Sequence, residues 1–78
     1  MNNIFTMAEL ENAFEIGRQM QCMIDAGHIE VEDSKEAFMF SLYLAVEFEK
    51  EFENTDNYYA DLYGFIVGKI LDKFGANE

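Results

Sequence analysis

Apolar residues recur at helical spacing along most of the chain, and capping signals divide it into three segments. The first segment opens on Thr6 and Glu9, which have the T-x-x-E spacing of a capping box, and Gly27 is a natural stop. We therefore expect a helix over 7–26, with Asn12 on its polar side. Its buried stripe is predicted to consist of Leu10, Ala13, Phe14, Gly17, Met20, Met23 and Ile24.

The second segment follows a connector at 27–33, and Asp33 is the N-cap expected for a helix over 34–53. Positions 37–46 are apolar on every side apart from Ser41, which is typical of a helix that is buried all round. Glutamates at 47, 49, 51 and 53 then alternate with Phe48, Lys50 and Phe52, a period of two that also occurs in strands. We favour a helix, because Glu and Lys are poor strand formers and the apolar stripe continues at helical spacing.

A turn at 54–57 precedes a third helix, which is predicted over 58–74 and ends at Gly75. Gly64 and Gly68 lie four residues apart, a spacing that favours close contact with another helix. The apolar stripe of this helix is predicted to consist of Tyr59, Leu62, Tyr63, Ile66, Ile70 and Phe74.

The expected architecture is an all-α, compact antiparallel three-helix bundle that forms a single domain over 1–78. A domain below about 80 residues seldom gains more than a few kcal/mol from its core. The single cysteine, Cys22, excludes an internal disulfide and is expected to be half-buried. Three helices cannot cover every side of 37–46, so we expect a homo-oligomer or a stable complex through the second or third helix.

The balance of charge narrows the choice of partners. The chain carries 16 acidic against 5 basic residues, for a net charge of −11, and half of it is hydrophobic. It is too apolar for a disordered acidic tail and too poor in bases to bind nucleic acid or an anionic membrane directly. With one cysteine, no secretory signal pattern and no membrane-spanning stretch, a cytoplasmic location is expected.

No motif of known chemistry is present, so an enzyme is not expected. One histidine and one cysteine are too few for a zinc site or a two-histidine-one-carboxylate site. The acidic stretch after His28 is interpreted as a solvated loop, and no cofactor or metal is expected. Carboxylate pairs such as Glu11 and Glu15 lie on helix faces, where they lack the cleft that acid–base catalysis needs.

Acidic residues gather in two stretches, 25–36 and 47–56. Like charges four residues apart destabilise a helix by about 0.2–0.5 kcal/mol per pair, so folding does not require this placement. Carboxylates on a rigid helix face can instead compete with phosphates for the Lys/Arg groove of a nucleic-acid-binding protein. The alternative is that the charge only keeps an apolar protein dispersed. The predicted partner-binding residues are Glu47, Glu49, Glu51, Glu53 and Asp56, then Glu30, Glu32, Asp33 and Glu36.

In size, acidity and helicity the chain resembles small phage-encoded inhibitors of host defence, the anti-CRISPR and anti-restriction proteins, many of which are DNA mimics. The resemblance covers the whole chain as composition and includes no motif. It implies an inhibitor that occupies a basic surface of a nucleic-acid-binding protein such as a CRISPR effector. A second hypothesis is a small structural or regulatory subunit that acts through an apolar helix face formed by Phe38, Phe40, Leu42, Tyr43 and Leu44.

Overall fold

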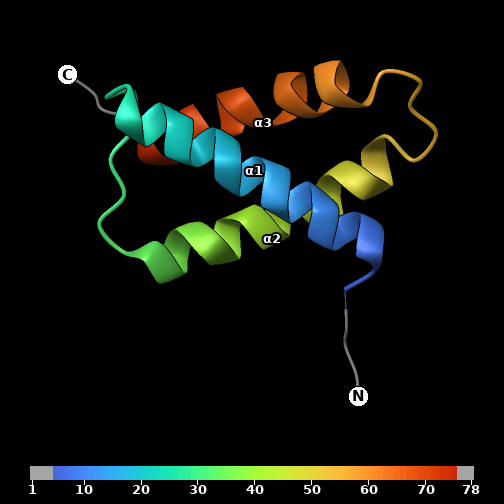
Figure 1. Cartoon of the computed structure of the whole chain (residues 1–78), viewed down its shortest axis with the longest axis horizontal. Coiled ribbons are helices and arrows are strands. Elements are labelled where there is room, and N and C mark those ends of the chain that lie inside the picture. Colours follow the sequence, from blue (N-terminus) through green and yellow to red (C-terminus); the bar gives the residue numbers. More distant parts are fainter. Residues whose placement is uncertain (1–4, 76–78) are drawn as a thin grey trace.

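The structure is a computed structural model that describes residues 5–75, and three α-helices make up most of that range (Figure 1). Helix α1 spans Met7–Asp25, α2 spans Ser34–Glu51 and α3 spans Tyr58–Phe74. The predicted all-α fold is confirmed. Two of the predicted helix ends lie slightly too far along the chain, because α1 and α2 were expected to reach residues 26 and 53. Of the predicted 1–78 domain, residues 1–4 and 76–78 lie outside the described range.

The three helices form two layers, with α1 lying diagonally in front of α2 and α3 (Figure 1). Consecutive helices run antiparallel, and the molecule is flat, measuring 37 × 31 × 17 Å. The backbones of α1 and α2 pack closely, whereas α3 stands farther away and reaches the core through its side chains. The tightest interhelical contact is therefore the one between α1 and α2.

Helix α1 has well-defined signals at both ends. At its start the Thr6 hydroxyl accepts from the Glu9 N–H at 3.1 Å and the Glu9 carboxylate accepts from the Thr6 N–H at 2.9 Å, which confirms the predicted capping box. At its end Gly27 has a φ of 82°, a conformation that strains residues with a Cβ. This turn lets the His28 N–H donate to the Met23 carbonyl at 2.9 Å, as in a Schellman motif.

Helices α2 and α3 begin differently from each other. Asp33 caps α2 as predicted, because its carboxylate accepts from the Lys35 N–H at 3.0 Å. Asn57, the first residue before α3, makes no such side-chain bond. The Thr55 hydroxyl connects the turn to α3 instead, because it accepts from the Asn57 N–H at 3.1 Å and donates to the Asp61 carboxylate.

The connector after α1 is fixed against the end of α3. Ile29 forms an isolated antiparallel bridge with Gly75, and the Glu30 N–H donates to the Phe74 carbonyl at 3.1 Å. The Ile29 side chain is only 2% exposed. The predicted loop therefore contributes an apolar side chain to the core and links the end of α1 to the end of α3.

The core takes one face from each helix, and aromatic rings fill the wider space beside α3. The Phe48 ring stacks on Phe52 with centroids 4.9 Å apart and meets Tyr58 edge-on at 5.8 Å. Full burial of one Ile, Leu or Phe side chain stabilises a fold by about 1.5–3 kcal/mol. The buried apolar residues are Ile16, Met20, Met23, Ile29, Leu44, Ala45, Phe48, Leu62, Ile66, Ile70 and Phe74.

The predicted buried stripe of α1 is wrong at its N-terminal end. Met20 and Met23 are buried as expected, but Leu10 and Phe14 are 45% and 66% exposed, while Asn12 is 2% exposed. The helix is turned so that an amide, and not the nearest large apolar side chains, faces the core. This orientation leaves an apolar surface on the outside of α1.

Helix α2 is not buried on every side as its apolar sequence predicted. Ser41, Leu44 and Ala45 face the core, whereas Phe38 and Tyr43 are 61% and 57% exposed. The exposed side agrees with the expectation that three helices cannot cover all of this segment. The structure thus contains surplus apolar surface on α2 as well as on α1.

Three smaller predictions also fail. A Cβ added at Gly64 or Gly68 would meet no atom of another part of the fold within 4 Å, so the close helix contact predicted there is not formed within residues 5–75. Cys22 is exposed, not half-buried. Tyr59, predicted in the buried stripe of α3, is 56% exposed because it lies at the open end of the helix beside the turn.

Candidate functional site

Four of the predicted partner-binding residues lie around the start of α2. Glu30, Glu32, Asp33 and Glu36, called the connector acids below, are all exposed. Two of them have structural contacts, since Asp33 caps α2 and a Glu36 carboxylate oxygen lies 3.2 Å from Lys73 Nζ. Within the described part of the chain, the carboxylates of Glu30 and Glu32 make no hydrogen bond or ion pair.

Three further members of the predicted set lie where α2 ends. Glu51 closes the helix, Glu53 and Asp56 follow in the turn, and all three are exposed; we call them the turn acids. The 18 residues of α2 rise about 1.5 Å each, so the two ends of this helix, where the connector acids and the turn acids lie, are about 27 Å apart. The two connectors lie at opposite ends of the molecule (Figure 1). The predicted set therefore forms two groups and not one continuous row.

Glu47 and Glu49, the remaining two, are half-buried and belong to the packing of α2. Glu47 Oε2 lies 3.8 Å from Lys50 Nζ, and Glu49 Oε1 accepts a hydrogen bond from Asn12 Nδ2 at 3.3 Å. These contacts engage the two carboxylates within the protein itself. They offer less free charge to a partner than the sequence pattern suggested.

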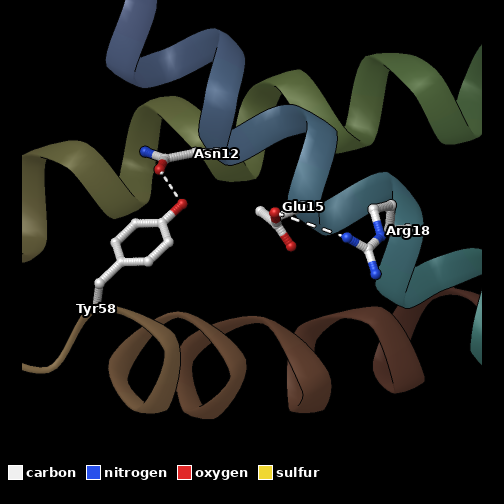
Figure 2. Close-up of polar contacts among 4 residues, drawn as sticks. All are labelled: Asn12, Glu15, Arg18 and Tyr58. Carbon is white, nitrogen blue, oxygen red and sulfur yellow. Dashed lines mark hydrogen bonds and ion pairs between the residues drawn. The ribbon is translucent and has the colours of Figure 1, made fainter.

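A polar cluster that the sequence pattern missed lies between the helices (Figure 2). The Tyr58 hydroxyl donates to Asn12 Oδ1 at 2.6 Å, and Asn12 Nδ2 also lies 3.4 Å from the Ala45 carbonyl. Asn12 in α1 thus binds both α2 and α3. The available signal was spacing, because Asn12, Ile16 and Met20 follow one another at intervals of four residues on what proves to be the buried face.

The tyrosines near this cluster are held in their protonated form. Burial raises the pKa of Tyr58 to about 12, and the charges of Glu15 and Glu11 contribute in the same direction. Burial and then Glu15 also raise the pKa of Tyr63, partly offset by Arg18. Arg18 Nη1 lies 3.9 Å from the Glu15 carboxylate, as Figure 2 shows. These shifts matter only at alkaline pH, because a tyrosine with the ordinary pKa of 10.0 is already protonated and able to donate a hydrogen bond at neutral pH.

An apolar groove of about 640 Å³ runs between α1 and α2, and we call it the α1–α2 groove. No aspartate or glutamate lines it, and Arg18 is its one charged residue. Its large exposed side chains come from both helices, and its small residues are half-buried between them. The large members are Leu10, Phe14 and Phe38, and the small ones include Ala13, Gly17 and Ala37.

Residues 5–75 contain neither a cluster of possible metal ligands nor a helix that could span a membrane. No three His, Cys, Asp or Glu side chains in that range lie close enough together to hold a metal ion. His28 is exposed on the connector. None of the three helices has the length and apolar content needed to span a bilayer.

Comparison with known proteins gave no relative: no family model, curated protein or solved structure matches this chain. Function therefore has to be inferred from the surface of the molecule itself. Its distinctive features are the two exposed acidic groups and the α1–α2 groove.

Proposed function

We propose that this protein is a non-enzymatic cytoplasmic inhibitor that binds a basic surface of a nucleic-acid-binding protein, such as a CRISPR effector. The observation that carries the proposal is the unused charge at both ends of α2. Glu30, Glu32, Glu51, Glu53 and Asp56 are exposed, and no ion pair or hydrogen bond engages their carboxylates among residues 5–75. Since these charges repel one another and add nothing to packing, recognition of a basic partner accounts for them better than folding does.

The separation of the two groups defines the partner surface. DNA rises about 3.4 Å per base pair, so the distance of about 27 Å between the two ends of α2 corresponds to about eight base pairs. A basic groove that holds a duplex of this length can contact both groups at once. Long-range attraction between the net charge of −11 and such a groove would speed association.

The test is capture of partners from a bacterial lysate on the immobilised protein, followed by elution with a salt gradient. We expect nucleic-acid-binding proteins to elute below about 0.5 M salt, because screening weakens contacts between exposed charges. The double substitution Glu51→Lys/Glu53→Lys should weaken capture of the same proteins about tenfold, by removing favourable charge and adding repulsion.

The matched control is Glu11→Lys/Asp72→Lys, which changes the net charge by the same amount at exposed positions outside both acidic groups. This control should reduce capture less than about threefold, because it weakens only the long-range attraction between the net negative charge and the basic partner. Binding that persists unchanged at about 1 M salt, where the Debye length is about 3 Å, would rule out recognition by charge.

A second candidate, a structural or regulatory subunit, is favoured by the exposed apolar side of α2. Phe38 and Tyr43 are both exposed, but Phe38 lines the α1–α2 groove whereas Tyr43 lies on the side of α2 near Lys69 and Lys73 of α3. Met39 is also 57% exposed. Leu44, first expected in the contact, is fully buried and belongs to the core. A partner held by the Tyr43 side of α2 would be released by Tyr43→Glu and would be insensitive to the charge reversals above.

A further inference from the structure

We infer that a second copy of this chain occupies the α1–α2 groove, so that the protein forms a two-fold symmetric homodimer. The groove contains what such a contact needs in charge and shape. This inference is independent of the inhibitor function proposed above, because the groove includes neither the connector acids nor the turn acids.

The lining of the groove differs in charge from the rest of the molecule. Fourteen residues line it, and the overall composition of 16 acids in 78 residues would place about three acids among them, yet there is none. Two copies, each with a net charge of −11, repel wherever their acids face each other. The acid-free groove is where they approach at least electrostatic cost, whereas a basic partner would gain from acids in the same place.

The shape of the groove also suits contact with itself. A two-fold interface places the same patch opposite itself, so that each copy has to supply both projections and recesses. Phe14 and Phe38 project, at 66% and 61% exposed. Gly17 carries no side chain in the same lining, and the space that a Cβ would occupy there is open. The Phe14 ring of one copy can therefore pack over Gly17 of the other, where burial of an aromatic anchor contributes strongly to binding.

The groove lining covers residues 10–24 of α1 and 34–42 of α2, which correspond to about 21 Å and about 12 Å of helix. A standard interface covers about 800 Å² on each copy, so the contact would also use apolar surface beside the groove. Met7, which is 73% exposed on α1, extends the apolar surface beyond the groove.

The first test substitutes a glycine inside the groove and one outside it. At about 100 μM, size-exclusion chromatography with light scattering should give twice the chain mass of 9.1 kDa for the wild type. Gly17→Gln fills the open space at this position and should give a monomer. Gly64→Gln is the control, because Gly64 lies on the exposed side of α3 outside the groove and a Cβ there likewise meets no other atom within 4 Å; this variant should stay dimeric. Both substitutions favour helix, so circular dichroism should show both variants folded.

The second test places a negative charge on an exposed apolar position. Phe14→Glu should raise the dissociation constant of the dimer at least about tenfold, because each copy then presents a carboxylate to the other. Met39→Glu adds the same charge at a similarly exposed position outside the groove and should change it less than about threefold. A wild-type monomer at about 100 μM, or a dimer that persists in both groove variants, would overturn the inference.

Discussion

The side chain of Asn12 lies where the three helices meet, and it has hydrogen-bond partners on two of them. Its Oδ1 accepts from the Tyr58 hydroxyl at 2.6 Å, and its Nδ2 faces the Ala45 carbonyl at 3.4 Å. A buried amide without partners costs about 1–3 kcal/mol, so α1 is held in the rotation that satisfies Asn12. The same rotation leaves Leu10 and Phe14 on the outside, which creates the α1–α2 groove.

The variant Tyr58→Phe tests this cluster. At pH 8 it should lower the free energy of unfolding by about 1–2 kcal/mol, because Asn12 Oδ1 loses its donor. The pKa of Tyr58 is about 12 in the fold against 10.0 without it, so the unfolded chain releases this proton first. Its contribution is therefore complete below pH 10 and is lost as the pH rises through 12. Urea unfolding at several pH values should show that the free energy of unfolding falls less steeply between pH 10 and pH 12 in Tyr58→Phe than in the wild type.

Part of the alkaline loss should remain in Tyr58→Phe, because the pKa of Tyr63 is raised in the same direction. Tyr43→Phe is the matched control, since it removes a hydroxyl from a side chain that is 57% exposed. It should leave the free energy of unfolding at pH 8 unchanged. Equal pH profiles for the wild type and Tyr58→Phe would assign the alkaline loss to other groups.

At the scale of the element, the capping box of α1 provides the clearest prediction. Thr6→Ala should lower the free energy of unfolding by about 1 kcal/mol, because the Glu9 N–H loses its side-chain acceptor. The two hydrogen bonds of the box are reciprocal. Thr6→Ala/Glu9→Ala should therefore cost less than the two single changes added together, as urea unfolding can measure. Glu11→Ala, on the exposed side of the same helix, is the control for the loss of a negative charge. If the changes in the free energy of unfolding for Thr6→Ala and Glu9→Ala simply added up in the double variant, the two hydrogen bonds would not depend on each other.

The limits of the helices could be predicted from the sequence because their signals are local. Thr6, Gly27 and Asp33 each act within a few residues of a helix end, and all three act as predicted. The rotation of α1 could not be predicted in the same way. Leu10 and Phe14 have the apolar character of core residues, and only the partners of a polar residue on other helices decide that they stay outside.

The candidate site was predictable to a similar extent. Glu51 and Glu53 are exposed, as their place at the end of an acidic helix suggested. Glu49 and Glu36 have partners more than thirty residues away, on α1 and α3 respectively, and no local pattern reports such contacts. The α1–α2 groove also escaped prediction, because it follows from the exposure of residues that the pattern placed in the core.

At the scale of the whole molecule, the two proposals are compatible. A dimer through the α1–α2 groove would bury the exposed rings of Phe14 and Phe38 and leave the turn acids free, whereas the connector acids Glu32 and Asp33 would lie at its edge, beside Val31 and Ser34. Each dimer would then carry two copies of both acidic groups. Linked copies raise the effective concentration of the second contact once the first has formed, so a basic partner with repeated sites would bind more tightly than to a monomer.

The net charge of −11 makes the stability of the molecule depend on salt. The ion pairs among residues 5–75 are exposed or long, at 3.2, 3.8 and 3.9 Å, and such pairs contribute about 0–1 kcal/mol each. Repulsion among acids therefore dominates, and screening it should stabilise the fold.

Raising sodium chloride from about 10 mM to about 150 mM shortens the Debye length from about 30 Å to about 8 Å, less than the molecule's shortest dimension of 17 Å. Most of the gain in the free energy of unfolding, on the order of 1 kcal/mol, should fall in that range. Glu51→Lys/Glu53→Lys brings the net charge to −7, so added salt should raise its free energy of unfolding by less than it does for the unsubstituted chain. Because dimer formation also responds to salt, the measurement belongs on the uncharged Gly17→Gln variant, which is expected to be monomeric. Stability that falls with added salt would mean that the ion pairs outweigh the repulsion.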